Sequence, residues 1–285
     1  MTGGSAAEGR LPIGVCLRSI RAEPAWWLKS AQRLDQAGYA GLWCWDHFMG
    51  RADKTVPVVE SWTALAMAAA RTRQATIGPF VMNVMNRHPA VVARMASTLQ
   101  NASGGRLILG IGIGGAPREH EAYGIDFPEA PERVARLEEA IAVIRALWSG
   151  GPVTRPSRFY PLVDAYAYPL PVPAPRILVG GETPAGARLA GRIGDGWTTF
   201  EDTFEDHLPL YLGALELAGR RRADQLVLVG FQDDWLAEGS IRDSPWVTDP
   251  RATWQRWQAA GADGAIVLAR SDDDVEALVE AAAGW

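Results

Sequence analysis

The residues best suited to acid–base chemistry follow an apolar segment, Ala40–Asp46, that has the composition of a buried strand. His47 comes directly after it, and an imidazole can gain or lose a proton near neutral pH. The carboxylate of Asp46 could fix the orientation of His47 if the chain turns between the two residues. A histidine in this position could equally serve only to cap the strand by hydrogen bonding. Asp46 and His47 are therefore candidate catalytic residues.

A second group of candidates lies in the glycine-rich run 104–124, where an apolar strand ends in Gly110, Gly112, Gly114 and Gly115. Glycines at the carboxyl end of a strand let a ligand lie against the backbone and tolerate positive φ at the turn. The run also matches the dinucleotide fingerprint G-x-G-x-x-G, but Pro117 and a loop follow where that fold requires a helix. Close packing of a buried strand is another alternative. We interpret the run as the floor of a cofactor site, with contacts at Gly112, Gly114 and Gly115.

The ends of three other expected strands supply further candidates for cofactor binding. The segment 75–84 carries an apolar patch with one amide, formed by Phe80, Val81 and Asn83. Gly180 and Gly181 end another strand directly before a helix, and the strand after that carries Thr198 and Thr199. Backbone N–H groups at a helix start and nearby hydroxyls are the donors that bind phosphate. We therefore predict a cofactor phosphate at Gly180, Gly181, Thr198 and Thr199.

Other kinds of catalytic site find little support in the sequence. The four histidines are not paired at metal-binding spacing, and no G-x-S-x-G motif presents a serine nucleophile. We expect no metal and a site in which a bound cofactor does the chemistry that the protein positions.

Strand-like and helix-like segments alternate along the chain. The expected strands cover residues 11–18, 40–46, 75–84, 106–114, 176–180, 195–200, 225–231 and 263–269. Each precedes an expected helix, at 24–37, 60–71, 88–102, 131–148, 184–192, after 200 to 218, 249–260 and 272–283. A polar loop is expected between residues 115 and 130. Eight such pairs predict an α/β fold, a (β/α)8 TIM barrel with insertions at about 150–175 and 232–247, whose chemistry lies at the carboxyl ends of the strands.

The composition is that of a large globular protein, with 285 residues of which 48% are hydrophobic and 21% charged. Its 28 basic and 33 acidic residues give a net charge of −5, which argues against a nucleic-acid or membrane-surface partner. Cys16 and Cys44 both lie in apolar segments, as expected for buried thiols in a reducing compartment. We expect a flexible tail over 1–10, a single barrel domain over 11–285, and a cytoplasmic protein without a membrane span.

The helix expected over 60–71 is apolar on more than one face. A helix that packs only on its own barrel shows a single apolar stripe. We therefore predict a homodimer formed through this helix and the helix over 88–102. The alternative is an alanine-rich outer helix that is merely tightly packed.

Several motifs, taken in order along the chain, resemble the luciferase-like monooxygenase superfamily of flavin- and deazaflavin-dependent oxidoreductases. They are Trp45-Asp46-His47-Phe48, His88–Leu99, Ser103–Gly112, Glu119–Gly124 and Gly180-Gly181 with Ala190–Gly196. The resemblance extends from the first strand to about Phe200.

This resemblance implies a tricyclic flavin or deazaflavin lying across the strand ends and supported by a bulge in the third strand. In the family that bulge carries a non-prolyl cis peptide, and the matching bond is Phe80–Val81. The sequence Asp46-His47-Phe48 favours coenzyme F420, because FMN-using members tend to carry Glu-His-His there. The chain departs from the pattern at Gly115, where some F420 enzymes of the family carry a catalytic glutamate.

We therefore expect an oxidoreductase that exchanges a hydride between coenzyme F420 and a small organic substrate, with His47 handling a proton near the ring. Two alternatives are an FMN-dependent two-component monooxygenase and a flavin-binding relative without turnover.

Overall fold

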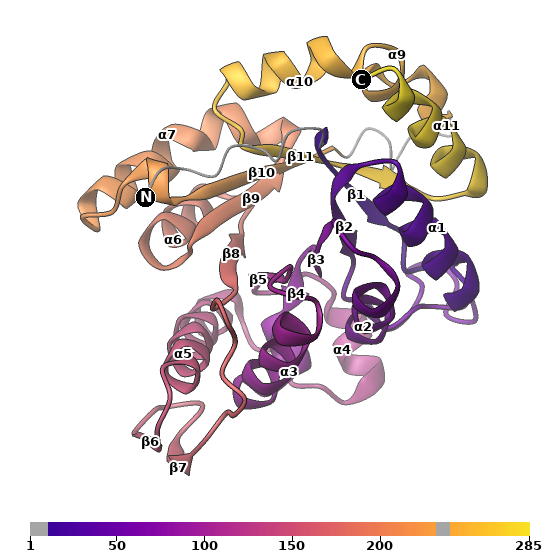
Figure 1. Ribbon diagram of the computed structural model, residues 1–285. Coiled ribbons are helices and arrows are strands. Elements are labelled where there is room, and N and C mark those ends of the chain that lie inside the picture. Colours follow the sequence, from indigo (N-terminus) through magenta and orange to yellow (C-terminus); the bar gives the residue numbers. More distant parts are fainter. Residues whose placement is uncertain (1–10, 232–239) are drawn as a thin grey trace.

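Parallel strands form a nearly closed ring with helices around its outside in the computed structural model, which describes residues 11–231 and 240–285 (Figure 1). Within these residues the sheet runs in the order β3-β2-β1-β11-β10-β9-β8-β5-β4. The ring closes where the N–H of Ile77 in β3 donates to the carbonyl of Arg106, just before β5, at 2.9 Å. The expected (β/α)8 TIM barrel is confirmed.

The strands lie close to the predicted segments, and most of them end at or just before a glycine, proline or polar residue that interrupts the apolar run. They are β1 (Leu11–Leu17), β2 (Tyr39–Cys44), β3 (Thr76–Pro79), β4 (Met82–Asn83), β5 (Ile108–Gly112), β8 (Arg176–Gly180), β9 (Gly196–Phe200), β10 (Leu226–Gly230) and β11 (Gly264–Ala269). The segment 75–84, expected as one strand, is divided into β3 and β4 by Phe80 and Val81. Because β3 pairs with β2 and β4 pairs with β5, the interruption lies within a single position of the barrel wall.

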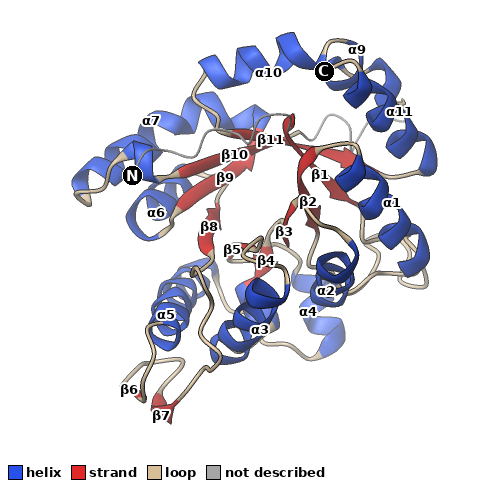
Figure 2. Cartoon of the chain, in the orientation of Figure 1, coloured by secondary structure: helices blue, strands red, loops and turns tan. Residues whose placement is uncertain are grey.

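Helices cover the outer surface of the barrel (Figure 2). They are α1 (Pro24–Gln36), α2 (Ser61–Arg71), α3 (Pro89–Ala102), α5 (Ala130–Trp148), α6 (Pro184–Ile193), α7 (Glu201–Leu217), α10 (Pro250–Ala259) and α11 (Asp272–Ala283). The predicted apolar stripe of α5 is buried, with Leu137, Ile141 and Ile144 at most 2% exposed. No helix among the described residues is both long and apolar enough to cross a bilayer.

The barrel interior is packed around the indole of Trp43 in β2. A Cβ atom added at Gly14, Gly41 or Gly78 would lie 2.5, 2.7 or 2.8 Å from that indole, so these three glycines make the space that the ring fills. The same inner cluster contains Cys16, Phe80, Leu178, Leu228, Ile266 and Leu268. The interior is therefore a solid core, which leaves the carboxyl ends of the strands as the place for a ligand.

The two insertions differ in how they relate to the barrel. The first forms an antiparallel pair, β6 (Val153–Arg155) and β7 (Leu162–Ala165), which projects beyond α3 and α5 (Figure 1). In the second, residues 232–239 lie outside the described part of the chain, as does the expected tail at 1–10. Residues 240–247 form a short 3-10 helix, η3 (Ile241–Asp243), and the start of α9 (Pro245–Thr248).

A helix, α4 (Pro117–Tyr123), stands where a polar loop was expected after β5. Pro117 begins it, and Gly124 ends it in the left-handed conformation at φ 65°. The expectation of a loop was wrong because seven residues show too little periodicity to reveal a helix. Contacts with distant residues hold α4 at the mouth of the barrel.

Candidate active site

His47 lies just beyond β2 at the mouth of the barrel, and a carboxylate from α4 holds its ring. The His47 Nδ1 and Glu119 Oε2 atoms are 2.9 Å apart, and the N–H of Phe48 donates to the other Glu119 oxygen. Because the carboxylate accepts at Nδ1, neutral His47 carries its proton there, and Nε2 remains to exchange a proton with a ligand. The pairing therefore selects one nitrogen of His47 for chemistry.

Glu119 is buried, with 5% of the residue exposed. Burial alone raises the pKa of a carboxyl, but the bonds from His47 and the Phe48 N–H outweigh it and lower the pKa of Glu119. Glu119 is thus an anion at neutral pH. Beside this pair a cavity of about 280 Å³ is lined by His47, Phe48, Val58, Glu60 and Tyr123.

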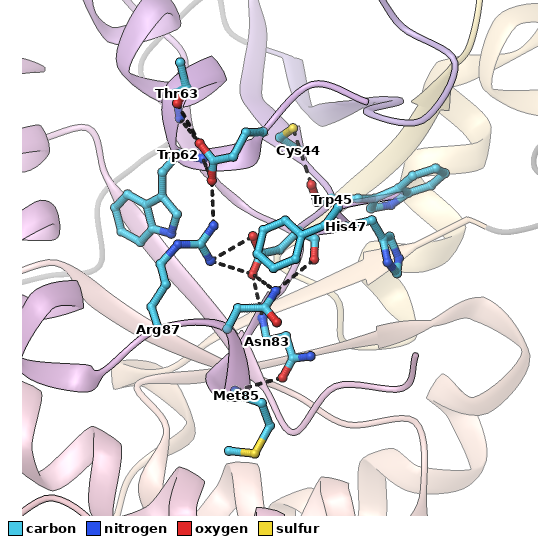
Figure 3. Close-up of polar contacts among 12 residues, drawn as sticks. Cys44, Trp45, His47, Trp62, Thr63, Asn83, Met85 and Arg87 are labelled. Atoms are coloured by element: carbon cyan, nitrogen blue, oxygen red, sulfur yellow. Dashed lines mark hydrogen bonds and ion pairs between the residues drawn. The ribbon is translucent and has the colours of Figure 1, made fainter. Parts of the chain in front are cut away.

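Asp46 has a different set of partners from the one expected. Both of its oxygens accept from Arg87 Nη1 at 2.9 Å, and the Asn83 N–H and the Asn86 amide donate to Oδ2 at 3.1 and 3.0 Å. Figure 3 shows this cluster, with the His47 ring lying away from Arg87. The expectation that Asp46 orients His47 was wrong, because its carboxylate ties the end of β2 to residues 83–87 instead. Glu119, and not Asp46, is the carboxylate that holds the His47 ring in its orientation.

The Phe80–Val81 peptide bond is cis, as the family resemblance implied. The Val81 side chain, which is half-buried, fills the space above three glycines of neighbouring strands. A Cβ atom added at Gly110, Gly112 or Gly180 would lie 3.0, 3.0 or 2.8 Å from a Val81 methyl group. Gly112 and Gly180 therefore serve first to seat Val81 on β5 and β8, whereas a Cβ atom at Gly110 would first meet the Pro79 carbonyl. The valine then presents an apolar surface at the mouth.

Asn83 and Gly114 form a second contact with α4. The Asn83 amide donates to His120 Nε2 at 2.8 Å, and its oxygen accepts from the Met85 N–H at 2.9 Å. Gly114, at φ 75°, lies so close to this amide that a side chain would collide with it. The Asn83 side chain is thus engaged in holding α4. In contrast, a Cβ atom at Gly115 would have no heavy atom within 4 Å, so Gly115 borders open space.

The residues predicted to bind phosphate lie together at the ends of the neighbouring strands β8 and β9. Most of them have contacts within the protein that explain their presence without a phosphate. The Gly181 N–H donates to the Thr198 carbonyl at 3.1 Å, and a Cβ atom at Gly181 would lie 2.6 Å from the Gly186 backbone. Close strand–helix packing therefore explains this glycine. The Thr199 hydroxyl pairs with that of Thr203 at 2.7 Å. The Thr198 hydroxyl is buried and has no partner among the described residues.

These features fit a flat, multi-ring ligand with polar groups at its edge. Val81 supplies an apolar surface, and Gly115 leaves space. Thr198 offers an unpaired buried hydroxyl, which structures rarely leave without a partner. His47 supplies Nε2, a nitrogen that can take up and release a proton.

Glu119 and Arg87 were not among the predicted site residues. Glu119 was part of the motif Glu119–Gly124 that carried the family resemblance, and Pro117 and Gly124 flank it as helix signals. Arg87 gave no such signal, because nothing local marks which carboxylate it will meet.

The chain belongs to the luciferase-like monooxygenase family, whose sequence model matches residues 14–232. An F420-dependent glucose-6-phosphate dehydrogenase of Microbacterium testaceum is 39% identical over 186 residues, covering 63% of this chain and 53% of that protein. The enzyme of the same name from Nakamurella multipartita is 32% identical over 253 residues, covering 85% of this chain and 70% of that one. In these matches the chain spans between about half and 70% of the length of the curated relatives.

Solved structures share the fold. An F420-dependent secondary alcohol dehydrogenase, solved in complex with an F420-acetone adduct, superposes with a TM-score of 0.82 at 22% identity. That match covers 95% of this chain and 97% of the other. The monooxygenase RslO1 from Streptomyces bottropensis superposes with a TM-score of 0.75 at 21% identity, over 96% and 97%. At these identities the likeness concerns the fold alone.

Proposed function

We propose that this protein is an oxidoreductase that exchanges a hydride between coenzyme F420 and a small organic substrate. The observation that carries the proposal is the pairing of His47 with Glu119 just beyond β2. The relatives whose names state F420 dependence support the choice of cofactor. The sequence Asp46-His47-Phe48 supports it as well.

In this proposal the deazaflavin supplies the carbon centre that accepts or gives the hydride. Val81 would offer an apolar contact to the ring, and the Thr198 hydroxyl would be available to hydrogen-bond the cofactor. His47 Nε2 takes up or gives the proton that accompanies hydride transfer. Glu119 keeps His47 in one orientation and stabilises the imidazolium that forms when Nε2 gains a proton.

Titration by ultraviolet–visible spectroscopy tests the cofactor. Purified protein is titrated with F420 and, separately, with FMN, and the absorbance change of each cofactor is followed. We expect saturable binding of F420 that is at least tenfold tighter than that of FMN. Tighter binding of FMN would instead support the two-component monooxygenase, and binding of F420 without turnover of any alcohol or sugar would support the non-catalytic relative.

We also propose a homodimer, formed by α2 and α3. An apolar groove of about 520 Å³ runs between these helices on the outer surface. Its lining is Trp62, Ala66, Ala69, Ala70, Arg94, Met95, Thr98, Leu99 and Ala102. Small residues at exposed helix positions allow close approach of a second helix pair, and the occupant that we propose is a second copy of this chain.

A cytoplasmic location is proposed from the cysteines. Both thiols are free and buried, with Cys16 and Cys44 on neighbouring strands. Free thiols are typical of reducing compartments.

A further inference from the structure

Arg18 stands at the carboxyl end of β1, next to the strand that leads to His47. β1 and β2 pair in register, with Leu17 opposite Cys44, so Arg18 lies beside Trp45. The Arg18 N–H also donates to the Ala269 carbonyl at 3.1 Å, which places Arg18 beside the end of β11. In a barrel of this kind, residues at the carboxyl ends of strands face the ligand.

The guanidinium of Arg18 has no carboxylate within ion-pair distance among the described residues. Its Nε is buried and makes no hydrogen bond. The contact that it does make is with the ring of Trp26, whose centroid lies 5.5 Å from Cζ. A half-buried cation has lost part of its hydration, and within residues 11–231 and 240–285 no carboxylate pairs with this one.

Charged groups of both signs lie near Arg18, and the one described carboxylate among them, Asp274, is engaged by Arg270. The nearby carboxylate of Asp274 accepts from the Arg270 N–H at 2.6 Å and faces Arg270 Nε at 3.5 Å. Arg21 lies on the loop that follows β1. Burial lowers the pKa of Arg18, and the charges of Arg270 and Arg21 act in the same direction against Asp274.

We propose that Arg18 is an anion-binding residue of the barrel mouth and receives a phosphate or carboxylate group of the ligand. A guanidinium suits this role because its planar set of N–H donors matches either group. The anion could belong to the substrate or to the cofactor. Assigning the anion to the substrate or to the cofactor rests on the proposed function. The proposal that Arg18 binds an anion does not depend on that function.

Thermal unfolding with simple anions tests the site without any cofactor. Wild type, Arg18→Met and the control Arg188→Met, which removes an exposed arginine of α6, are unfolded at constant ionic strength in chloride, inorganic phosphate and acetate. We expect phosphate or acetate to raise the midpoint of wild type and the control, and the apparent Kd to be at least tenfold weaker for Arg18→Met. Without added anion, Arg18→Met should be no less stable than wild type, because the variant loses a half-buried charge that no described carboxylate pairs with.

An equal shift in Arg18→Met and wild type would overturn the proposal, as would the absence of any anion-specific shift in wild type. A large loss of stability in anion-free Arg18→Met would also overturn it, since Arg18 would then be structural. Titration with F420 identifies the source of the anion. A tenfold loss of F420 affinity in Arg18→Met assigns the group to the cofactor, and unchanged affinity assigns it to the substrate. If F420 binds neither protein while phosphate still protects wild type, the proposed function fails and the anion site stands.

Discussion

At the scale of single residues, the contact between His47 and Glu119 decides which nitrogen can do chemistry. The two residues are 72 positions apart in the sequence, and their bond of 2.9 Å joins β2 to α4. In the role that we propose for His47, a general acid or base typically contributes about 10²–10⁴-fold to a rate.

Replacing His47 separates proton chemistry from cofactor binding. His47→Ala should lower kcat by about 10²-fold or more while F420 affinity changes by less than tenfold. His47→Gln keeps a hydrogen-bonding group but cannot gain a proton near neutral pH, so it should restore binding without restoring turnover. Steady-state kinetics at saturating cofactor measure the first effect and spectroscopic titration the second. Normal kcat with weakened cofactor binding in both variants would make His47 a binding contact instead.

Glu119→Gln tests the positioning role of the carboxylate. We expect kcat to fall by about tenfold or more, with KM little changed, because the substituted amide no longer stabilises positive charge on His47. Glu121→Gln, at an exposed position of the same helix, is the matched control. Equal kinetics in the two variants would contradict a role for Glu119 in positioning His47.

The stability of Glu119→Gln should depend on pH in a defined direction. The pKa of Glu119 is lowered in the folded protein, so its contribution is present above the unfolded value of about 4.3 and is lost as the pH falls through the folded value. Wild type should therefore be more stable than Glu119→Gln at pH 7, and the difference should begin to shrink once the pH falls below about 4. Urea unfolding at both pH values measures it.

Thr198→Val tests the buried hydroxyl that has no partner within the described structure. The change removes an unsatisfied polar group at nearly constant volume, so the protein without cofactor should be equally stable or slightly more stable. Affinity for F420 should fall by about fivefold to tenfold, which corresponds to about 1–1.4 kcal/mol. Thr199→Val removes a hydroxyl that is already paired with Thr203, and cofactor affinity should not change in that control.

At the scale of elements, the mouth of the barrel is assembled by segments that clamp one another. Consecutive residues of α4 reach two different strands: Glu119 binds beyond β2, and His120 binds Asn83 of β4. The cis bond between Phe80 and Val81 lies between β3 and β4, where Val81 rests on glycines of β5 and β8. The surface that would support a flat ligand is therefore built from three strands and not from β5 alone.

The contact between Val81 and Gly180 can be measured with a double-mutant cycle. Gly180→Ala places a Cβ atom 2.8 Å from a Val81 methyl group, and we expect a loss of about 1–3 kcal/mol in the free energy of unfolding. Val81→Ala in the same chain should recover much of that loss, giving a coupling of about 1 kcal/mol or more in urea unfolding. Additive effects would show that Val81 is not seated on Gly180. Gly213→Ala on α7 is the matched control, because a Cβ atom there would have no heavy atom within 4 Å. Gly151→Ala would not serve, because Gly151 has φ 75° and an alanine there would be strained.

At the scale of the whole molecule, the groove between α2 and α3 predicts the oligomeric state. We expect light scattering at micromolar concentration to give twice the chain mass of 30.8 kDa for wild type. Ala66→Asp places a charge at an exposed position inside the groove and should yield a monomer with unchanged circular dichroism. Ala185→Asp, at an exposed position of α6, should remain dimeric. A monomeric wild type would show that the apolar groove serves another purpose.

The barrel and most of its elements could be predicted from the amino-acid sequence alone. Apolar runs bounded by glycine and proline mark the strands, and helical periodicity marks the outer helices, because both patterns are local consequences of which face is buried. The position of His47 after the second strand, and the glycines after the fourth, followed from the same rule once the fold was a barrel. The cis bond at Phe80–Val81 followed from resemblance and not from any local pattern.

The tertiary structure alone decided which side chains meet. Asp46 adjoins His47 in the chain, yet its carboxylate binds Arg87, 41 residues away, while Glu119 reaches His47 from 72 residues away. Helix α4 forms because these distant contacts hold it, and a seven-residue helix is too short to be stable from its own sequence. The glycines of β5 support a valine because β4 brings that valine over them. Adjacency in sequence sets the strand on which a residue lies, but the direction of each side chain and the partner within its reach depend on how the strands are arranged around the barrel.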